Sequence, residues 1–495
     1  MKQNALIRFL LLLLCVSLLV GSLVACGIEN TEETDTTADT TEETNEEEIP
    51  TEPKYVEDGL PADLKFDRDF VLLGSLNQRS HFWAEETATG TVDSAIYQRN
   101  STVEDRLGIT IKWDFRATSS SSDKSNFVNH VETDIQAGNK IDAVVTYNLI
   151  PYSLAVKGHA SNLADTEYID LEGPWWPSEY LDSMLYNGKI YALVSSCGVG
   201  TLTNLSGIFF NNTLLENKSL EDPYTLVKNN EWTLGKLKEL IKDTYEDKNQ
   251  NGKDDELDVY GLCTSSAPRI TCWYYGAGAR LSELDANGEL QLIANDTEKL
   301  NKVIDTLVDL FSTKNSLIYE SDATRYTVFR EERVYFYLSD IGLSSHLVNN
   351  NAKVDYGVVP NPKFDSAQTR YYTHLPNAHD AWFVPKGVKD MDCSSAVLEC
   401  MASEAYRQLN EVFFETNLKL RYAPDERLAE MYDLIRESIT FDFAYIYKEV
   451  LSKNCDYAII DCIRYPETKK WSTSWASMKD LVNTDFLKIL DLYQN

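Results

Sequence analysis

One short stretch of the sequence has the residue types and the spacing of a calcium-binding loop. Residues 247–258 read DKNQNGKDDELD, with oxygen-bearing side chains at alternate positions and a glycine at the sixth. In an EF-hand loop, side chains at positions 1, 3 and 5, a backbone carbonyl at position 7 and an acid at position 12 surround Ca²⁺. The ligands predicted on this pattern are Asp247, Asn249, Asn251, Lys253 through its carbonyl, and Asp258.

Two features of this loop depart from the EF-hand pattern. Position 12 is Asp258 rather than glutamate, so the side chain that carries the carboxylate is shorter by one methylene group. A helix predicted over 233–245 enters the loop, but residues 259–262 favour a strand where an EF-hand has its second helix. The stretch is therefore either a structural Ca²⁺ site or an acidic surface turn without metal. No cofactor is otherwise required by the sequence.

Catalytic motifs are not evident in the sequence. It lacks HExxH, GxSxG and the P-loop pattern, which argues against three common classes of hydrolase. A glycosidase needs only two carboxylates, and 78 acidic residues could supply them. We predict that the protein is not an enzyme, with a secreted glycosidase as the weaker alternative. The net charge of −32 also argues against binding to nucleic acid or to an anionic membrane surface.

The N-terminus has the pattern of a lipoprotein export signal. Lys2 and Arg8 precede an apolar run over 9–25, which ends in the lipobox-like LVAC at residues 23–26. We predict a signal peptide over 1–26 and lipidation at Cys26. The alternative is an uncleaved membrane anchor, because such a run is near the lower limit for spanning a bilayer. Both interpretations place the remaining chain outside the cytoplasmic membrane, and a lipid on Cys26 would hold it at the outer face, as in Gram-positive bacteria.

The next stretch has the composition of a tether. Residues 27–64 are rich in Glu, Asp and Thr, with no basic residue before Lys54. Such a segment buries too little apolar surface to offset its chain entropy, and its charges repel one another. We predict a disordered spacer between the membrane and a folded body.

The remaining cysteines leave two interpretations open. Seven lie beyond the signal peptide, without a CxxC motif or histidines at zinc spacing. Cys263 with Cys272 and Cys455 with Cys462 could form disulfides at an oxidising cell surface. Buried free thiols are an equal alternative.

The body of about 430 residues is long enough for two domains. Hydrophobic patterns predict strands over 70–74, 109–115, 141–145, 207–210 and 333–338. They predict helices over 94–107, 127–137, 233–242 and 297–310, and a largely helical final hundred residues. Strands that alternate with helices indicate a mostly parallel α/β sheet. The pattern restarts after residue 206, so we predict two α/β lobes, the second richer in helix.

Several segments of this body, taken in order, carry a family resemblance. They are YQRN at 97–100, VEDRLGI at 103–109, DAVV at 142–145, GPWW at 173–176, YNGKIYAL at 186–193, FFNN at 209–212 and DYGVVPNPK at 355–363. Together they resemble the extracellular solute-binding proteins of ABC importers, in the family-1, carbohydrate-associated group of Gram-positive bacteria. The resemblance runs from about residue 70 to the end of the chain.

This resemblance implies a fold and a division into lobes. The fold is a two-lobed, periplasmic-binding-protein-like (type 2) clamshell that closes about a hinge. Lobe 1 is expected over 65–198 and 376–406, and lobe 2 over 206–370 and 408–495. In open α/β sheets, ligands bind beyond the carboxyl ends of the strands. The loop at 77–83 is therefore expected at the cleft.

The implied function is capture of a sugar and its delivery to an ABC permease, by a protein expected to be monomeric. Aromatic faces would hold the sugar rings, and polar side chains would bond the hydroxyls. The predicted contact residues are Arg79, Tyr147, Asn148, Trp175, Trp273, Tyr274, Asp340, His374 and Trp382. A glycan-binding surface adhesin without a transport role is the main alternative function.

Overall fold

The computed structural model describes residues 56–264, 267–294, 298–318, 326–376, 379–422 and 425–494, all within the unit Tyr55–Asn495. The predicted signal peptide, the lipidation site Cys26 and most of the predicted tether lie outside the described residues. Within the described part of the chain, no helix is both long enough and apolar enough to cross a membrane.

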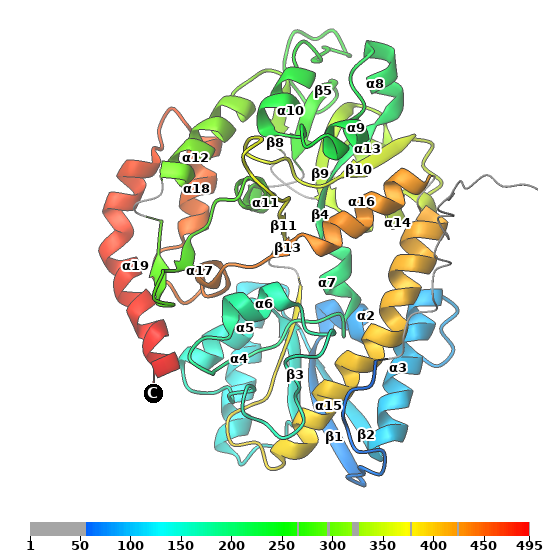
Figure 1. Cartoon of the computed structure of the whole chain (residues 1–495), viewed down its shortest axis with the longest axis vertical. Coiled ribbons are helices and arrows are strands. Elements are labelled where there is room, and N and C mark those ends of the chain that lie inside the picture. Colours follow the sequence, from blue (N-terminus) through cyan, green and yellow to red (C-terminus); the bar gives the residue numbers. More distant parts are fainter. Residues whose placement is uncertain are drawn as a thin grey trace, which may run out of the picture. The chain divides into compact units, whose positions relative to one another are not determined.

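The first of two large sheets has four strands, in the order β12-β3-β1-β2. Strand β1 pairs in parallel with β2 and β3, and β12 is antiparallel to β3. The strands are β1 (Arg68–Ser75), β2 (Ile109–Arg116), β3 (Ala143–Tyr147) and β12 (Asp380–Phe383). The helices beside them are α3 (Thr91–Leu107), α4 (Ser121–Gln136), α5 (Leu149–Val156) and α15 (Met391–Glu404). Figure 1 shows α3 and α15 packed side by side.

Local sequence explains where these elements begin and end. Helix α3 ends at Gly108, whose φ of 60° is a left-handed conformation that favours glycine. Helix α4 begins with a capping box, in which Ser120 and Asp123 bond each other's backbone N–H groups. Because of this cap, α4 starts six residues before the apolar pattern that predicted it. Gly74 lets β1 lie close to the ring of Phe115, which a side chain would displace.

The second large sheet has five strands, in the order β10-β4-β9-β5-β8. Strand β5 is parallel to β8 and β9, whereas β4 is antiparallel to β9 and β10. The strands are β4 (Ser206–Asn211), β5 (Tyr260–Thr264), β8 (Ser316–Ile318), β9 (Val334–Asp340) and β10 (Tyr356–Val359). Helices beside them include α10 (Leu234–Leu240), α11 (Ile270–Gly276), α12 (Glu298–Phe311) and α16 (Glu426–Glu437).

The chain passes between the two sheets more than once. It leaves the first sheet through α7 (Val199–Thr203), returns through β11 (Thr373–His374), and leaves again where α15 continues into η4 (Ala405–Leu409). The last helices, α17 (Phe443–Ile446), α18 (Cys455–Arg464) and α19 (Trp471–Gln494), make the second half of the chain helix-rich. The predicted fold class, two α/β lobes with a helix-rich second lobe, is confirmed.

Three local predictions need correction. The folded body begins before residue 65, because Asp58 is buried in ion pairs with Arg106 and Arg407, 2.7 and 2.9 Å away. The helix predicted over 233–245 is the shorter α10, since the chain turns after Leu240 and Asp243 has a left-handed φ. The seven cysteines beyond the signal peptide are all buried free thiols, so the disulfide alternative is wrong for this structure.

Candidate ligand-binding site

Side chains from both lobes meet at the carboxyl ends of the strands. We call the following seven the junction cluster: Tyr147, Asn148, Tyr275, His374, His379, Tyr445 and Lys448. In the first lobe, Tyr147 ends β3 and Asn148 follows it, and His374 and His379 lie on the segment that returns to that lobe. The other three come from α11, α17 and the turn after α17. All but the half-buried Tyr147 are buried.

An aromatic stack forms one side of the junction cluster. The ring of His374 lies 4.2 Å from that of Tyr275, nearly parallel to it, and 4.4 Å from the ring of Tyr445. The ammonium of Lys448 lies 3.9 Å from the centre of the Tyr445 ring. Burial raises the pKa of Tyr445 well above its usual range, and the charges of Asp456 and Tyr147 act in the same direction. Tyr147 therefore lies within electrostatic reach of this stack.

Several polar atoms of the junction cluster have no hydrogen-bond partner within the described residues. They are both amide atoms of Asn148, both ring nitrogens of His374, Nε2 of His379 and the hydroxyl of Tyr275. Buried polar groups in proteins nearly always have partners, and each one left without a partner costs about 1–3 kcal/mol. The cluster is thus suited to a ligand that can both donate and accept several hydrogen bonds.

The charges of the cluster are neutralised inside the protein. Lys448 bonds Asp456 at 3.1 Å, and the hydroxyl of Tyr274 donates to the same carboxylate. Burial lowers the pKa of His379 to about 4, and burial together with the charge of Lys448 lowers that of His374 well below its usual range. Both imidazoles are therefore neutral near pH 7, each with one donor and one acceptor nitrogen.

The carboxyl end of the second sheet carries a further polar pair. Asp340 at the end of β9 bonds the guanidinium of Arg269 at 2.6 Å, and both side chains are buried. On the neighbouring strand, Ser206 accepts a hydrogen bond from Asn361 at 2.7 Å and donates to the carbonyl of His374 at 3.1 Å. This chain of bonds connects the edge of the second sheet with the junction cluster.

The segment after β1 contributes a second aromatic group in the first lobe. The guanidinium of Arg79 lies 4.4 Å from the ring of Trp83, with Arg79 exposed and Trp83 half-buried. His81 bonds Asp380 at 3.0 Å, and the glycines Gly198 and Gly200 leave room for this pair. The pair connects the segment that carries Arg79 and Trp83 to the start of β12 in the same lobe.

The nine predicted contact residues are only partly brought together. Tyr147, Asn148 and His374 belong to the junction cluster, and Tyr274 bonds Asp456 beside it. Asp340 pairs with Arg269, and Arg79 stacks on Trp83, as described above.

The three predicted tryptophans lie elsewhere, in packed surroundings. Trp273 donates to Thr264 and packs on Phe311, and Trp382 packs edge-on against Phe82. Trp175 lies 6.4 Å from Tyr406, beside a buried carboxyl, Glu399, whose pKa burial raises to about 8. All three indoles are buried, and none contacts the junction cluster in the interactions described.

Four cluster members are not among the nine predicted contact residues, although the tract 273–276, which contains Tyr275, was expected at the cleft: Tyr275, His379, Tyr445 and Lys448. Tyr275 directly follows the predicted pair at 273–274, so its proximity in sequence was a usable signal. His379 lies five residues after the predicted His374. Tyr445 and Lys448 lie in a helical stretch about 170 residues beyond Tyr275, and no local pattern distinguishes them from core residues.

The loop at 247–258 folds around its own polar side chains. Asp247 accepts hydrogen bonds from the backbone N–H groups of Asn251 and Gly252, at 3.2 and 2.8 Å. Asp258 is buried and accepts from the hydroxyl of Tyr245 at 2.8 Å. Gly252, at position 6, has a φ of 74°, which supplies the sharp turn.

The donor atoms of this loop fit a hard cation. The side-chain oxygens of Asn249 and Asn251 each accept one backbone N–H, at 3.0 and 2.7 Å, and an amide oxygen has a second lone pair. With Asp247, Asp258 and the carbonyl of Lys253, they form the oxygen set that Ca²⁺ prefers. Strand β5 follows the loop, as the sequence predicted.

Comparisons with known proteins identify the fold. No family model and no curated protein matches the chain. Solved structures do match it: an ABC substrate-binding protein of Listeria monocytogenes in complex with cycloalternan (14% identity, TM-score 0.53), the GacH receptor of Streptomyces glaucescens (13%, 0.52) and the sugar-binding protein MalE of Xanthomonas citri (11%, 0.56). The first two matches cover 85% of this chain and the third 86%, and each covers 99% of the other protein.

At these identities the similarity establishes the fold. The chain has the two-lobed α/β fold of maltose-binding-protein-like periplasmic binding proteins. All three of these proteins are named as binding proteins or as a receptor rather than as enzymes, which agrees with the prediction of a non-enzymatic protein.

Proposed function

We propose that this protein binds a saccharide between its two lobes and delivers it to an ABC permease. The junction cluster is the observation that carries this proposal. It combines stacked rings, which suit the C–H faces of a sugar, with buried polar atoms that have no partner among the described residues and suit its hydroxyl groups. Solved structures of the same fold include an ABC substrate-binding protein in complex with cycloalternan and a protein named as a sugar-binding protein, which supports the same class of ligand.

The proposal includes a location and an anchor. A lipid on Cys26 would hold the protein at the outer face of the cytoplasmic membrane, and residues 27–55 would separate the body from that membrane. The apolar run ending in LVAC and the acidic composition of the following residues support this part. Incorporation of radiolabelled palmitate into the wild type, but not into Cys26→Ala, would test it.

Direct binding measurements test the function. The purified full-length chain is titrated calorimetrically with neutral mono- and oligosaccharides, and closure of the lobes is followed by small-angle scattering. We expect saturable binding of at least one saccharide together with a smaller radius of gyration. Binding without any change in the scattering would favour the adhesin. Release of new reducing ends from the saccharide would indicate a glycosidase and overturn the proposal.

We further propose that the loop at 247–258 binds a structural Ca²⁺. The oxygen donors described above support this assignment, and the positive φ of Gly252 gives the turn that such a loop requires. Bound Ca²⁺ would link α10 to β5 and so stabilise this part of the second lobe. It has no part in the proposed ligand contacts.

A further inference from the structure

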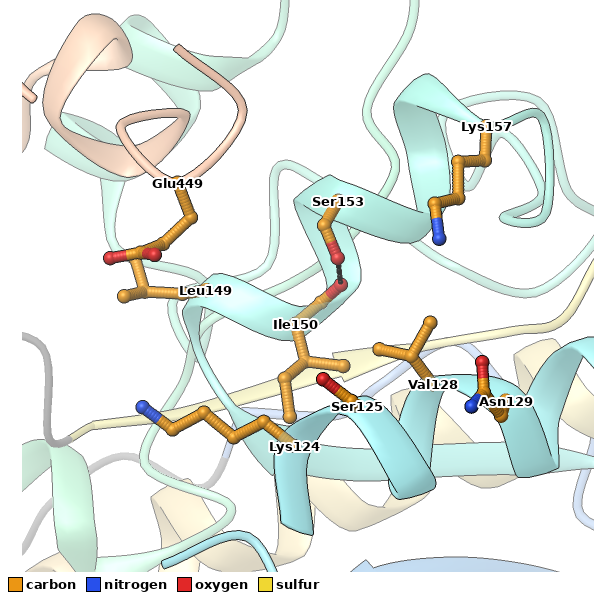
Figure 2. Close-up of a pocket in the computed structure, with 9 residues that line it drawn as sticks. All are labelled: Lys124, Ser125, Val128, Asn129, Leu149, Ile150, Ser153, Lys157 and Glu449. Atoms are coloured by element: carbon orange, nitrogen blue, oxygen red, sulfur yellow. Dashed lines mark hydrogen bonds between the residues drawn. The ribbon is translucent and has the colours of Figure 1, made fainter. Parts of the chain in front are cut away.

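A polar groove lies between α4 and α5 of the first lobe. Its volume is about 260 Å³. It is lined by Lys124, Ser125, Val128, Asn129, Leu149, Ile150, Ser153, Lys157 and Glu449. Figure 2 shows the side chains of Ser125, Val128 and Asn129 rising from α4 toward α5, and Glu449 approaching from the segment after α17. The groove is therefore built from the first lobe and from the C-terminal part of the chain.

The groove directly adjoins the junction cluster. Three of its lining residues are immediate neighbours of cluster residues. The ammonium of Lys124 lies 4.3 Å from the centre of the Tyr147 ring, Leu149 follows Asn148, and Glu449 follows Lys448. A ligand that contacts Tyr147 and extends beyond it would therefore meet Lys124 at the edge of the groove.

The lining of the groove suits a sugar ring. Ser125 and Asn129 are exposed, so their side chains offer hydrogen bonds to hydroxyl groups. Leu149 and Ile150 are buried and give an apolar floor for the C–H face of a ring. The groove carries charges of both signs, since Lys124 and Glu449 both line it. The charge of Lys157 is paired with that of Glu132 at 2.8 Å. The volume lies just below the range of pockets that hold drug-sized ligands, which corresponds to one ring of a longer molecule.

From this juxtaposition we propose that the groove is a second subsite, which binds the next residue of an oligosaccharide whose first residue occupies the junction cluster. The preferred ligand is then a neutral chain of at least two sugar units. This inference rests on the proposed function and specifies its substrate class.

A chain-length series with one blocking variant tests the inference. Calorimetric dissociation constants are measured for glucose, maltose and maltotriose, for cellobiose and cellotriose, and for xylose, xylobiose and xylotriose. We expect the best oligosaccharide to bind at least about 10-fold more tightly than its monosaccharide, since two or three additional hydrogen bonds suffice for that factor. Asn129→Trp fills the groove from an exposed position and should remove this advantage, leaving the monosaccharide affinity unchanged.

Asn126→Trp is the matched control. Asn126 is equally exposed on the same helix but does not line the groove, so this variant should keep the wild-type dependence on chain length. Binding of a saccharide without an advantage for longer chains, or with an advantage that Asn129→Trp leaves intact, would overturn this inference alone. Failure of the wild type to bind any saccharide, with a broader neutral panel included, would overturn the proposed function and this inference with it.

Discussion

The junction cluster and the loop at 247–258 are both polar, but they are built in opposite ways. The loop consists of twelve consecutive residues whose side chains mostly bond the loop's own backbone and one another. The cluster draws its members from positions 147 to 448 and buries all but Tyr147, with several polar atoms that have no partner in the described part of the chain. The side chains of a local motif can form their hydrogen bonds within the motif. In a site assembled from two lobes, donor and acceptor atoms stay available for hydrogen bonds to a ligand.

The largest effect is expected where the cluster keeps a charge pair inside the protein. Asp456→Ala would leave the buried ammonium of Lys448 without its carboxylate, which typically costs about 3–5 kcal/mol. Urea unfolding of the wild type and the variant measures this loss. Glu298→Ala breaks the exposed pair with Lys302 and should leave the free energy of unfolding nearly unchanged, because water and salt screen such a pair. Equal losses for the two variants would contradict the distinction between a buried site and an exposed pair.

The loop should respond to calcium, and the cluster should not. At a free Ca²⁺ concentration 100-fold above its dissociation constant, binding would stabilise the native state by about 2.7 kcal/mol. We therefore expect a chelator to lower the melting temperature of the wild type by a few degrees. Asp247→Asn combined with Asn251→Ala should abolish this response while preserving saccharide binding. A chelator effect of the same size in the double variant would show that the ion binds elsewhere.

The third prediction separates ligand contact from structural support in the cluster. Asn148 is fully buried, and neither of its amide atoms has a partner within the described residues. Asn148→Leu should therefore leave the free energy of unfolding of the unliganded protein unchanged or raise it, and weaken saccharide binding about 10-fold. Asn217→Leu, at an exposed position of α8 (Asn212–Lys218), should change neither quantity. Marked destabilisation by Asn148→Leu would point to a structural role instead.

The smallest effect concerns pH and the pair His81–Asp380 beside the cluster. Burial lowers the pKa of His81, but the charge and the hydrogen bond of Asp380 together outweigh burial and raise this pKa above its usual 6.5. The protonated pair therefore stabilises the folded state fully below pH 6.5 and loses this contribution as pH rises through the raised pKa. The difference in unfolding free energy between the wild type and His81→Gln should shrink from pH 6 to pH 9. A difference independent of pH would exclude a charged pair.

The same contrast explains how far the sequence could predict the site. Tyr147 and Asn148 were predicted because they directly follow an apolar strand, and ligands bind beyond such ends. His374 was predicted from its place near the expected hinge. The three tryptophans were chosen for their chemistry, yet their rings are buried against neighbours such as Phe82 and Phe311. Residue type alone does not distinguish an aromatic contact for a ligand from an aromatic side chain of the core.

By itself, the sequence determined the periodic and the contiguous features of this protein. Alternating strands and helices specified the two α/β lobes, and twelve consecutive residues specified the loop, since these patterns depend on neighbours along the chain. Tertiary structure alone decided that Tyr275 meets Tyr445, and that Lys124 and Glu449 line one groove beside them. These contacts join residues hundreds of positions apart, and their geometry is fixed by the packing of the two sheets rather than by any local preference of the chain.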